Sequence, residues 1–79
     1  MNNKEKYKKS FVDSLGVEEK LIHEELKYNE IPEWDSIGHM TLISGIEEGF
    51  NITMETDDII DFSSYNKGIE ILTKYKVSV

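Results

Sequence analysis

Apolar residues recur every three or four positions in three segments of this 79-residue chain, and strand-like alternation is absent over any useful length. Such spacing predicts amphipathic helices, with one further short helical turn between the second and the last of them. Gly16 is placed to end the first helix, and Asp35 is placed to cap the second. We therefore expect an all-α fold in a single domain, residues 1–79. The predicted helices span residues 4–15, 36–50, 56–62 and 64–75.

The connection between the first two predicted helices, residues 17–34, is long for a compact domain. It contains the only Pro and several apolar residues, which can hold it across a bundle with Trp34 as an anchor. A long connection also lets two helices lie side by side in antiparallel directions. The apolar stripes of the three longer predicted helices consist of Tyr7, Phe11, Val12, Leu15, Ile37, Met40, Leu42, Ile43, Ile46, Phe50, Tyr65, Ile69, Leu72 and Tyr75. In the short helical turn, Ile59, Ile60 and Phe62 are expected to be buried.

The net charge of −7 is unevenly distributed along the chain. Residues 1–10 carry +3 and residues 67–79 carry +2, whereas residues 11–66 carry −12. A polyanion without Arg is poorly suited to bind phosphates or an anionic membrane, so we expect neither a nucleic-acid partner nor a membrane partner. The chain has no Cys and no apolar run longer than two residues. We therefore expect a cytoplasmic monomer without disulfides, a signal peptide or a membrane span.

Patterns that bind metal ions are incomplete. His23 and Glu24 begin a metalloprotease-like string, but Lys27 stands where a second His is required. The acids of residues 57–61 lack the alternating spacing and the central Gly of a calcium loop. We expect no metal site, and we interpret His23 as a surface residue.

The string Asp35-Ser36 with His39 could suggest a hydrolase. Nothing in the sequence supplies a third group to orient the imidazole or an oxyanion hole, and the nucleophile-elbow motif is missing. We interpret His39 as a solvated helix residue and expect no hydrolase activity.

Ser36 stands directly after a helix cap. Free backbone N–H groups and the positive end of the helix dipole would favour a phosphate esterified to a serine at this position. The simpler interpretation is that Ser36 only helps to cap the helix. Two features of the helix favour a functional surface: Glu47 and Glu48 lie at its negative end, and three Gly residues weaken its interior.

The string Glu33-Trp34-Asp35-Ser36-Ile37-Gly38-His39-Met40, with the apolar and acidic residues that follow it, resembles the acyl carrier proteins. The similarity covers almost the whole chain. It implies an acyl-carrier-protein-like four-helix bundle with three longer helices, one short helix and a long first loop. The core residues that it implies are Phe11, Leu15, Leu42, Ile46, Phe50, Ile59, Phe62, Ile69 and Leu72.

A second string, Asp13-Ser14-Leu15-Gly16, matches the family's tetrapeptide better than the string at Ser36 does. Ser14 lies at the end of a predicted helix, however, where exposed carbonyl groups would repel a phosphate. Ser36 opens a helix with a sustained apolar stripe, so the context favours Ser36.

The resemblance implies a carrier and not an enzyme. A phosphopantetheinyl transferase would attach 4′-phosphopantetheine from coenzyme A to Ser36, with Asp35 near the transferase's magnesium ion. The arm's thiol would carry acyl groups as thioesters between synthase or acyltransferase enzymes of fatty-acid, polyketide or specialised lipid biosynthesis. A partner face that meets basic docking patches would consist of Met40, Glu47, Glu48, Asp57, Asp58 and Asp61.

Several positions depart from the fatty-acid-synthesis pattern, including Ile37, Gly38, Thr41 and Ser44. Trp34 and His39 are more similar to stand-alone carriers of specialised pathways. Two alternatives therefore remain open: an aminoacyl or peptidyl carrier loaded by a ligase, and an unmodified acidic interaction domain.

Overall fold

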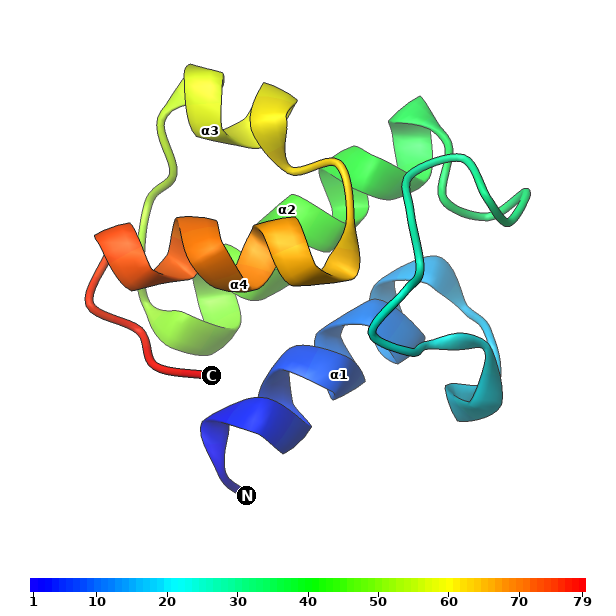
Figure 1. Cartoon of the computed structure of the whole chain (residues 1–79), viewed down its shortest axis with the longest axis horizontal. Coiled ribbons are helices and arrows are strands. Elements are labelled where there is room, and N and C mark those ends of the chain that lie inside the picture. The colour runs from blue at the N-terminus through cyan, green and yellow to red at the C-terminus, as the bar shows by residue number, and fades with distance from the viewer.

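The computed structural model describes all residues from Met1 to Val79 and contains four α-helices and no strand. The helices are α1 (Asn3–Leu15), α2 (Ser36–Phe50), α3 (Thr56–Asp61) and α4 (Tyr65–Lys74) (Figure 1). The predicted all-α fold is confirmed, and each predicted helix boundary lies within one residue of the observed one. None of these helices combines the length and the apolar character that a bilayer crossing requires.

Local signals explain where the helices begin and end. Asn2 caps α1, and Gly16 ends it with a left-handed φ of 66°. The Asp35 side chain caps α2, as predicted, and Ser64 caps α4. Helix α3 begins at Thr56 behind Glu55 and has no side-chain cap.

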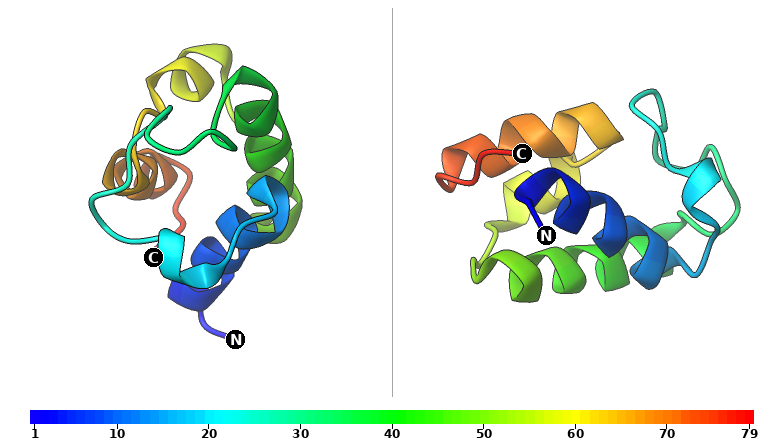
Figure 2. Two further views of the ribbon diagram at one scale, coloured as in Figure 1. Left: turned by 90° about the vertical axis from the view of Figure 1, so that its right-hand side faces the viewer. Right: turned by 90° about the horizontal axis from the view of Figure 1, so that it is seen from below.

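Helices α1 and α2 lie side by side and run in opposite directions, and α4 lies across the same core (Figure 2). The connection from Val17 to Asp35 is not structureless, since it contains a 3-10 turn at Glu19–Leu21. It is fixed to the α3–α4 junction by two backbone hydrogen bonds, from Tyr28 to Ser63 and from Tyr65 to Leu26. The long loop therefore crosses the bundle, as its apolar residues predict.

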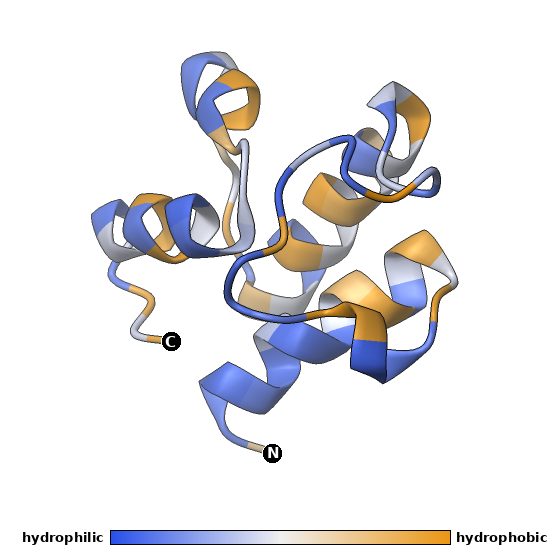
Figure 3. Cartoon of the chain, turned by 45° about the vertical axis from the view of Figure 1, so that its right-hand side comes forward, coloured by the Kyte–Doolittle hydropathy of each residue, from blue (hydrophilic) through white to orange (hydrophobic).

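The core is rich in aromatic rings that meet edge to face. Trp34 and Phe11 are fully buried, with ring centroids 5.2 Å apart at 86°. The buried Tyr7 hydroxyl donates a 2.7 Å hydrogen bond to the Tyr65 carbonyl, and burial raises the pKa of the Tyr7 phenol. Figure 3 shows the hydrophobic segments of the helices and of the long loop. Trp34 is the loop anchor that the sequence predicts.

Three apolar side chains of the predicted helices are exposed, although only Ile60 among them was expected to be buried. Ile37, Met40 and Ile60 expose 78%, 53% and 72% of their surface. The spacing placed Ile37 and Met40 on the apolar stripe of α2, but the buried face of α2 runs through positions 39, 42, 43 and 46. α3 has only six residues and turns one side to the core, so Ile60 faces outward. Expected core residues that are only partly buried are Phe50, Ile59 and Ile69.

Glycines in α2 allow close contact with neighbouring backbone and side chains. A Cβ on Gly38 would lie 2.1 Å from the Glu33 carbonyl oxygen, and one on Gly45 would lie 2.7 Å from Ser14 Oγ. Packing therefore requires small residues at these two positions. Packing thus explains Gly38 and Gly45 without a functional surface, whereas it does not explain Gly49.

Candidate functional site

Ser36 is exposed and is the first residue of α2. The Asp35 carboxylate caps the helix by accepting a 2.8 Å hydrogen bond from the Gly38 N–H. The backbone N–H groups of Ser36 and Ile37 donate to no group in the chain, and the first turn contains no acid. The positive end of the helix dipole therefore faces solvent beside the Ser36 hydroxyl.

His39 is buried, so its interpretation as a solvated residue was wrong. Its Nδ1 accepts a 2.9 Å hydrogen bond from Trp34 Nε1, and its Nε2 lies 2.9 Å from the Ile59 carbonyl oxygen. The long loop covers this side of α2, which the helix alone would leave in solvent. The sequence does contain an indication that His39 is buried, because position 39 lies four residues before Ile43 and seven before Ile46, on the same face of the helix.

These hydrogen bonds also exclude a Ser36–His39 dyad in this arrangement. Both ring nitrogens of His39 are occupied by other partners, so neither is free to accept the Ser36 proton. The structure offers no general base to Ser36 from His39.

Exposed apolar side chains lie beside Ser36. Ile37 is the next residue, and Met40 lies one turn further along α2. Ile60 is exposed on α3, the helix that contacts α2 through His39 and Ile59. Met40, a predicted partner residue, is thus accessible, as is Ile37, whereas Ile60 was expected to be buried and is exposed on α3.

The six residues of the predicted partner face do not form one group. Asp57 and Asp61 are exposed on α3 and make no ion pair, so they remain accessible. Glu48 is exposed but borders a hollow of about 370 Å³ together with Lys9 and Asp13 of α1. Glu48 therefore lies toward α1.

Glu47 has a structural partner. It is half-buried, and its Oε2 accepts a 2.8 Å hydrogen bond from the Met54 N–H in the connection after α2. Its placement at the negative end of the helix is explained by this bond, so Glu47 is not a freely exposed docking residue.

Asp58 is buried and is not part of an exposed face. Its Oδ1 accepts a 2.6 Å hydrogen bond from Lys74 Nζ, and its Oδ2 accepts one from the Tyr75 hydroxyl. The hydrogen bonds from Lys74 and Tyr75 lower the pKa of the Asp58 carboxyl, and the Asp58 carboxylate raises the pKa of Lys74. Asp58 therefore joins α3 to the end of α4.

Ser14, the serine of the competing motif, is half-buried at the contact between α1 and α2. Its Oγ lies so close to Gly45 that even a Cβ there would be 2.7 Å away. A bulky group on Ser14 would separate the two helices, whereas Ser36 has no such neighbour.

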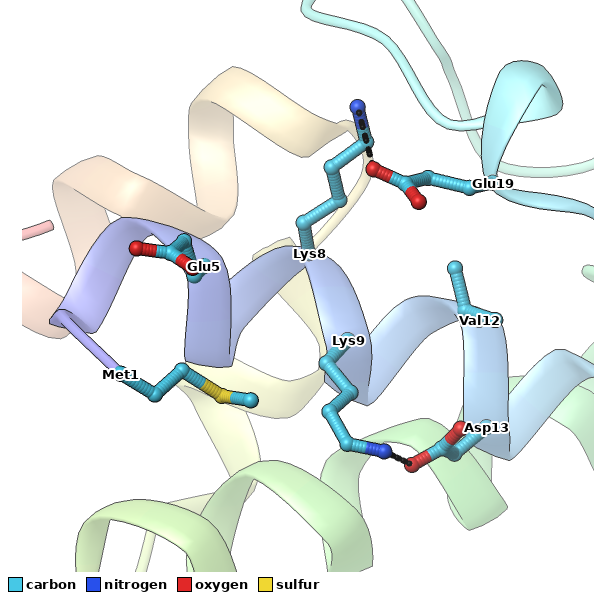
Figure 4. A pocket seen from close by; sticks show the side chains of 7 residues that line it. All are labelled: Met1, Glu5, Lys8, Lys9, Val12, Asp13 and Glu19. Atoms are coloured by element: carbon cyan, nitrogen blue, oxygen red, sulfur yellow. Dashed lines mark hydrogen bonds and ion pairs between the residues drawn. The ribbon is translucent and has the colours of Figure 1, made fainter.

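The hollows of the surface lie away from Ser36. One of about 360 Å³ lies over α1, where the Lys9–Asp13 pair (2.9 Å) and the Lys8–Glu19 pair (3.6 Å) neutralise its charges (Figure 4). No three His, Cys, Asp or Glu side chains are grouped to hold a metal ion. The site at Ser36 is thus an open surface and not a pocket.

No protein-family model matches the chain, and no curated protein matches it either.

Proposed function

We propose that this protein is an acyl carrier whose Ser36 receives a 4′-phosphopantetheine arm. The observation that carries the proposal is the exposed Ser36 hydroxyl in the first turn of α2, directly after the Asp35 cap, where the backbone N–H groups of Ser36 and Ile37 have no partner in the chain. The negative phosphodiester of the arm would lie where the helix dipole favours an anion. The resemblance of residues 33–50 to acyl carrier proteins agrees with this assignment.

The modification would be catalysed by a phosphopantetheinyl transferase. Ser36 Oγ loses its proton and attacks the β-phosphorus of coenzyme A, a phosphoester bond to Ser36 forms, and adenosine 3′,5′-bisphosphate leaves. The exposed Asp35 carboxylate uses only Oδ1 in the helix cap, so its other oxygen can face the transferase's magnesium ion. The chain itself has no Cys, and the arm would supply the thiol that carries the cargo.

Partner enzymes would dock on the exposed residues around Ser36. Met40, Ile37 and Ile60 offer adaptable apolar contact, and the exposed carboxylates of Asp57 and Asp61 would meet basic patches. Asp58 and Glu47 are excluded from this face because their carboxylates are engaged within the fold.

Intact mass spectrometry tests the proposal. Incubation with coenzyme A and a promiscuous transferase should add the mass of one phosphopantetheinyl group to the wild type. Ser36→Ala should gain nothing, whereas the matched variant Ser14→Ala should be modified like the wild type. Absence of the added mass in the wild type, or its persistence in Ser36→Ala, would contradict the proposal.

The nature of the cargo is a separate question. An acyl-loading ligase and an aminoacyl-loading ligase can each be offered the modified protein, and the thioester that forms identifies the class of carrier. An unmodified interaction domain would instead keep its function in Ser36→Ala.

A further inference from the structure

His39 links three parts of the chain that are distant in sequence. It belongs to α2, accepts a hydrogen bond from Trp34 at the end of the long loop, and lies 2.9 Å from the carbonyl of Ile59 in α3. The imidazole and the Trp34 ring are nearly coplanar, with an interplanar angle of 21° and centroids 6.1 Å apart, and the rings of Tyr28 and Phe62 meet the imidazole at steep angles. This arrangement places a buried titratable group at a junction of elements.

The partners of His39 permit only one protonation state. The indole N–H of Trp34 can only donate, so Nδ1 of His39 must be an unprotonated acceptor. The Ile59 carbonyl can only accept, so Nε2 must carry the ring's single proton. A second proton would place a donor on Nδ1 against the donor of Trp34, and this contact would have to break.

Few charged groups surround the imidazole to compensate a positive charge. The long loop contributes Trp34 and the titratable Tyr28, α3 contributes the Ile59 carbonyl, and Phe62 closes the side toward α4. The Asp58 carboxylate, next to Ile59, is already paired with Lys74 and Tyr75, and Asp35 on α2 caps the helix from an exposed position. No carboxylate forms a hydrogen bond or ion pair with His39.

We infer that His39 is a proton-sensitive latch that holds Trp34 and the end of the long loop against α2 in its neutral form and releases them when protonated. The contact that a second proton breaks is the one between Trp34 Nε1 and Nδ1, which ties the end of the long loop to α2. The Nε2–H group keeps its acceptor, the Ile59 carbonyl, so α3 stays attached to α2 in both forms.

The latch is a property of the fold and does not depend on modification of Ser36. Its importance for a carried group rests on the proposed function, because Trp34 lies two residues before Ser36. Protonation would then move the surface around the arm without altering the attachment residue.

The composition of the chain gives this inference a clean test. Trp34 is the only Trp, and the chain has only two His, so Trp34 fluorescence and its indole N–H signal in NMR report on His39 directly. Unmodified wild-type protein is titrated from pH 8 to pH 5, around the range in which an exposed imidazole takes up a proton, near pH 6.5. We expect a one-proton change in both Trp34 signals.

Two matched variants separate the latch from other titrations. Gln at position 39 can accept from Trp34 and donate to Ile59 but does not titrate, so His39→Gln should remove the change. His23→Gln, at the exposed histidine, should leave it intact. In the wild type, the hydrogen-exchange protection of the Asn29 and Trp34 amides, which form backbone hydrogen bonds at the end of the long loop, should fall by up to about tenfold per pH unit below the transition, after correction for intrinsic rates.

A Trp34 transition that survives in His39→Gln, or no transition in the wild type, would overturn the latch. If His39→Gln does not fold at pH 8, the wild-type NMR titration decides alone, because the His39 ring and the Trp34 indole N–H must then titrate together. The transition is measured on protein without the arm. Failure of the proposed function would therefore appear only in the mass of the transferase product, not in this titration.

Discussion

Single residues at the start of α2 are constrained by very close contacts. Gly38 has no room for a Cβ, because the Glu33 carbonyl oxygen would lie 2.1 Å from it and cannot move as a flexible side chain can. Gly49, in the last turn of the same helix, has its nearest obstacle at an ordinary 3.8 Å. A side chain is therefore excluded by packing at Gly38 but not at Gly49.

Replacing these glycines should have effects of opposite sign. Gly38→Ala should destabilise the protein by about 1–3 kcal/mol, because overpacking forces the backbone apart. Gly49→Ala should be neutral or stabilise it by up to about 1 kcal/mol, since Ala favours a helix and the space is available. Urea unfolding followed by the fluorescence of buried Trp34 measures both. Equal effects of the two substitutions would contradict the packing argument.

The Asp58 carboxyl should make stability depend on pH. Its pKa is lowered in the folded state, chiefly by the hydrogen bond from Lys74, so its contribution is present above the ordinary Asp pKa of about 3.9 and is lost as the pH falls. Asp58→Asn should lower the urea midpoint at pH 7, and its difference from the wild type should shrink toward pH 3. Asp57→Asn, at an exposed neighbour without an ion pair, should leave the midpoint nearly unchanged.

At the scale of elements, α2 contributes residues both to the core and to the candidate site. One side carries His39, Leu42, Ile43 and Ile46 into the core, and the other presents the residues beside Ser36. Its C-terminal end is joined to the following connection by the hydrogen bond from the Met54 N–H to Glu47. This bond directs the chain toward α3.

Removing the Glu47 side chain should destabilise the protein, because the loss of its hydrogen bond outweighs the relief of an unfavourable charge at the helix C-terminus. Glu47→Ala leaves the Met54 N–H without its acceptor, at a cost of about 1–3 kcal/mol, whereas removing a negative charge from the helix C-terminus gains only about 0.3–1 kcal/mol. We expect a net loss of about 1 kcal/mol. Glu48→Ala, which removes an exposed acid from the same end, should change stability by less than about 0.5 kcal/mol. Thermal and urea unfolding of both variants measures whether Glu47 stabilises the fold through its hydrogen bond while Glu48 acts only as an exposed acid.

At the scale of the whole molecule, the charges are only partly compensated. Four ion pairs form, and three of them lie on α1 or the start of the long loop. The carboxylates of the α2–α3 region other than Asp58 have no Lys within ion-pair distance. Apart from the Lys74–Asp58 pair, the basic ends of the chain therefore form no ion pair with the acids of the α2–α3 region.

Added salt should stabilise the protein. The Debye length falls from about 30 Å at 0.01 M ionic strength to about 8 Å at 0.15 M, which screens the repulsion among the unpaired acids. For a domain of this size, each kcal/mol of repulsion relieved raises the melting temperature by about 4–8 °C. Differential scanning calorimetry across this range checks the expectation. An unchanged or lower melting temperature in salt would mean that attractive pairs dominate.

The sequence by itself determined the helices, their main caps and the anchoring role of Trp34. These features depend on local periodicity, on Asp35 and Gly16 at helix ends, and on a large apolar side chain in a polar loop. Tertiary structure alone decided which surface residues remain accessible. His39, Glu47 and Asp58 appear in the sequence as solvated polar residues, yet each is engaged by a partner at least five positions away. Helical periodicity describes one element, whereas the burial of a polar side chain depends on which distant segment covers it and offers it a hydrogen bond.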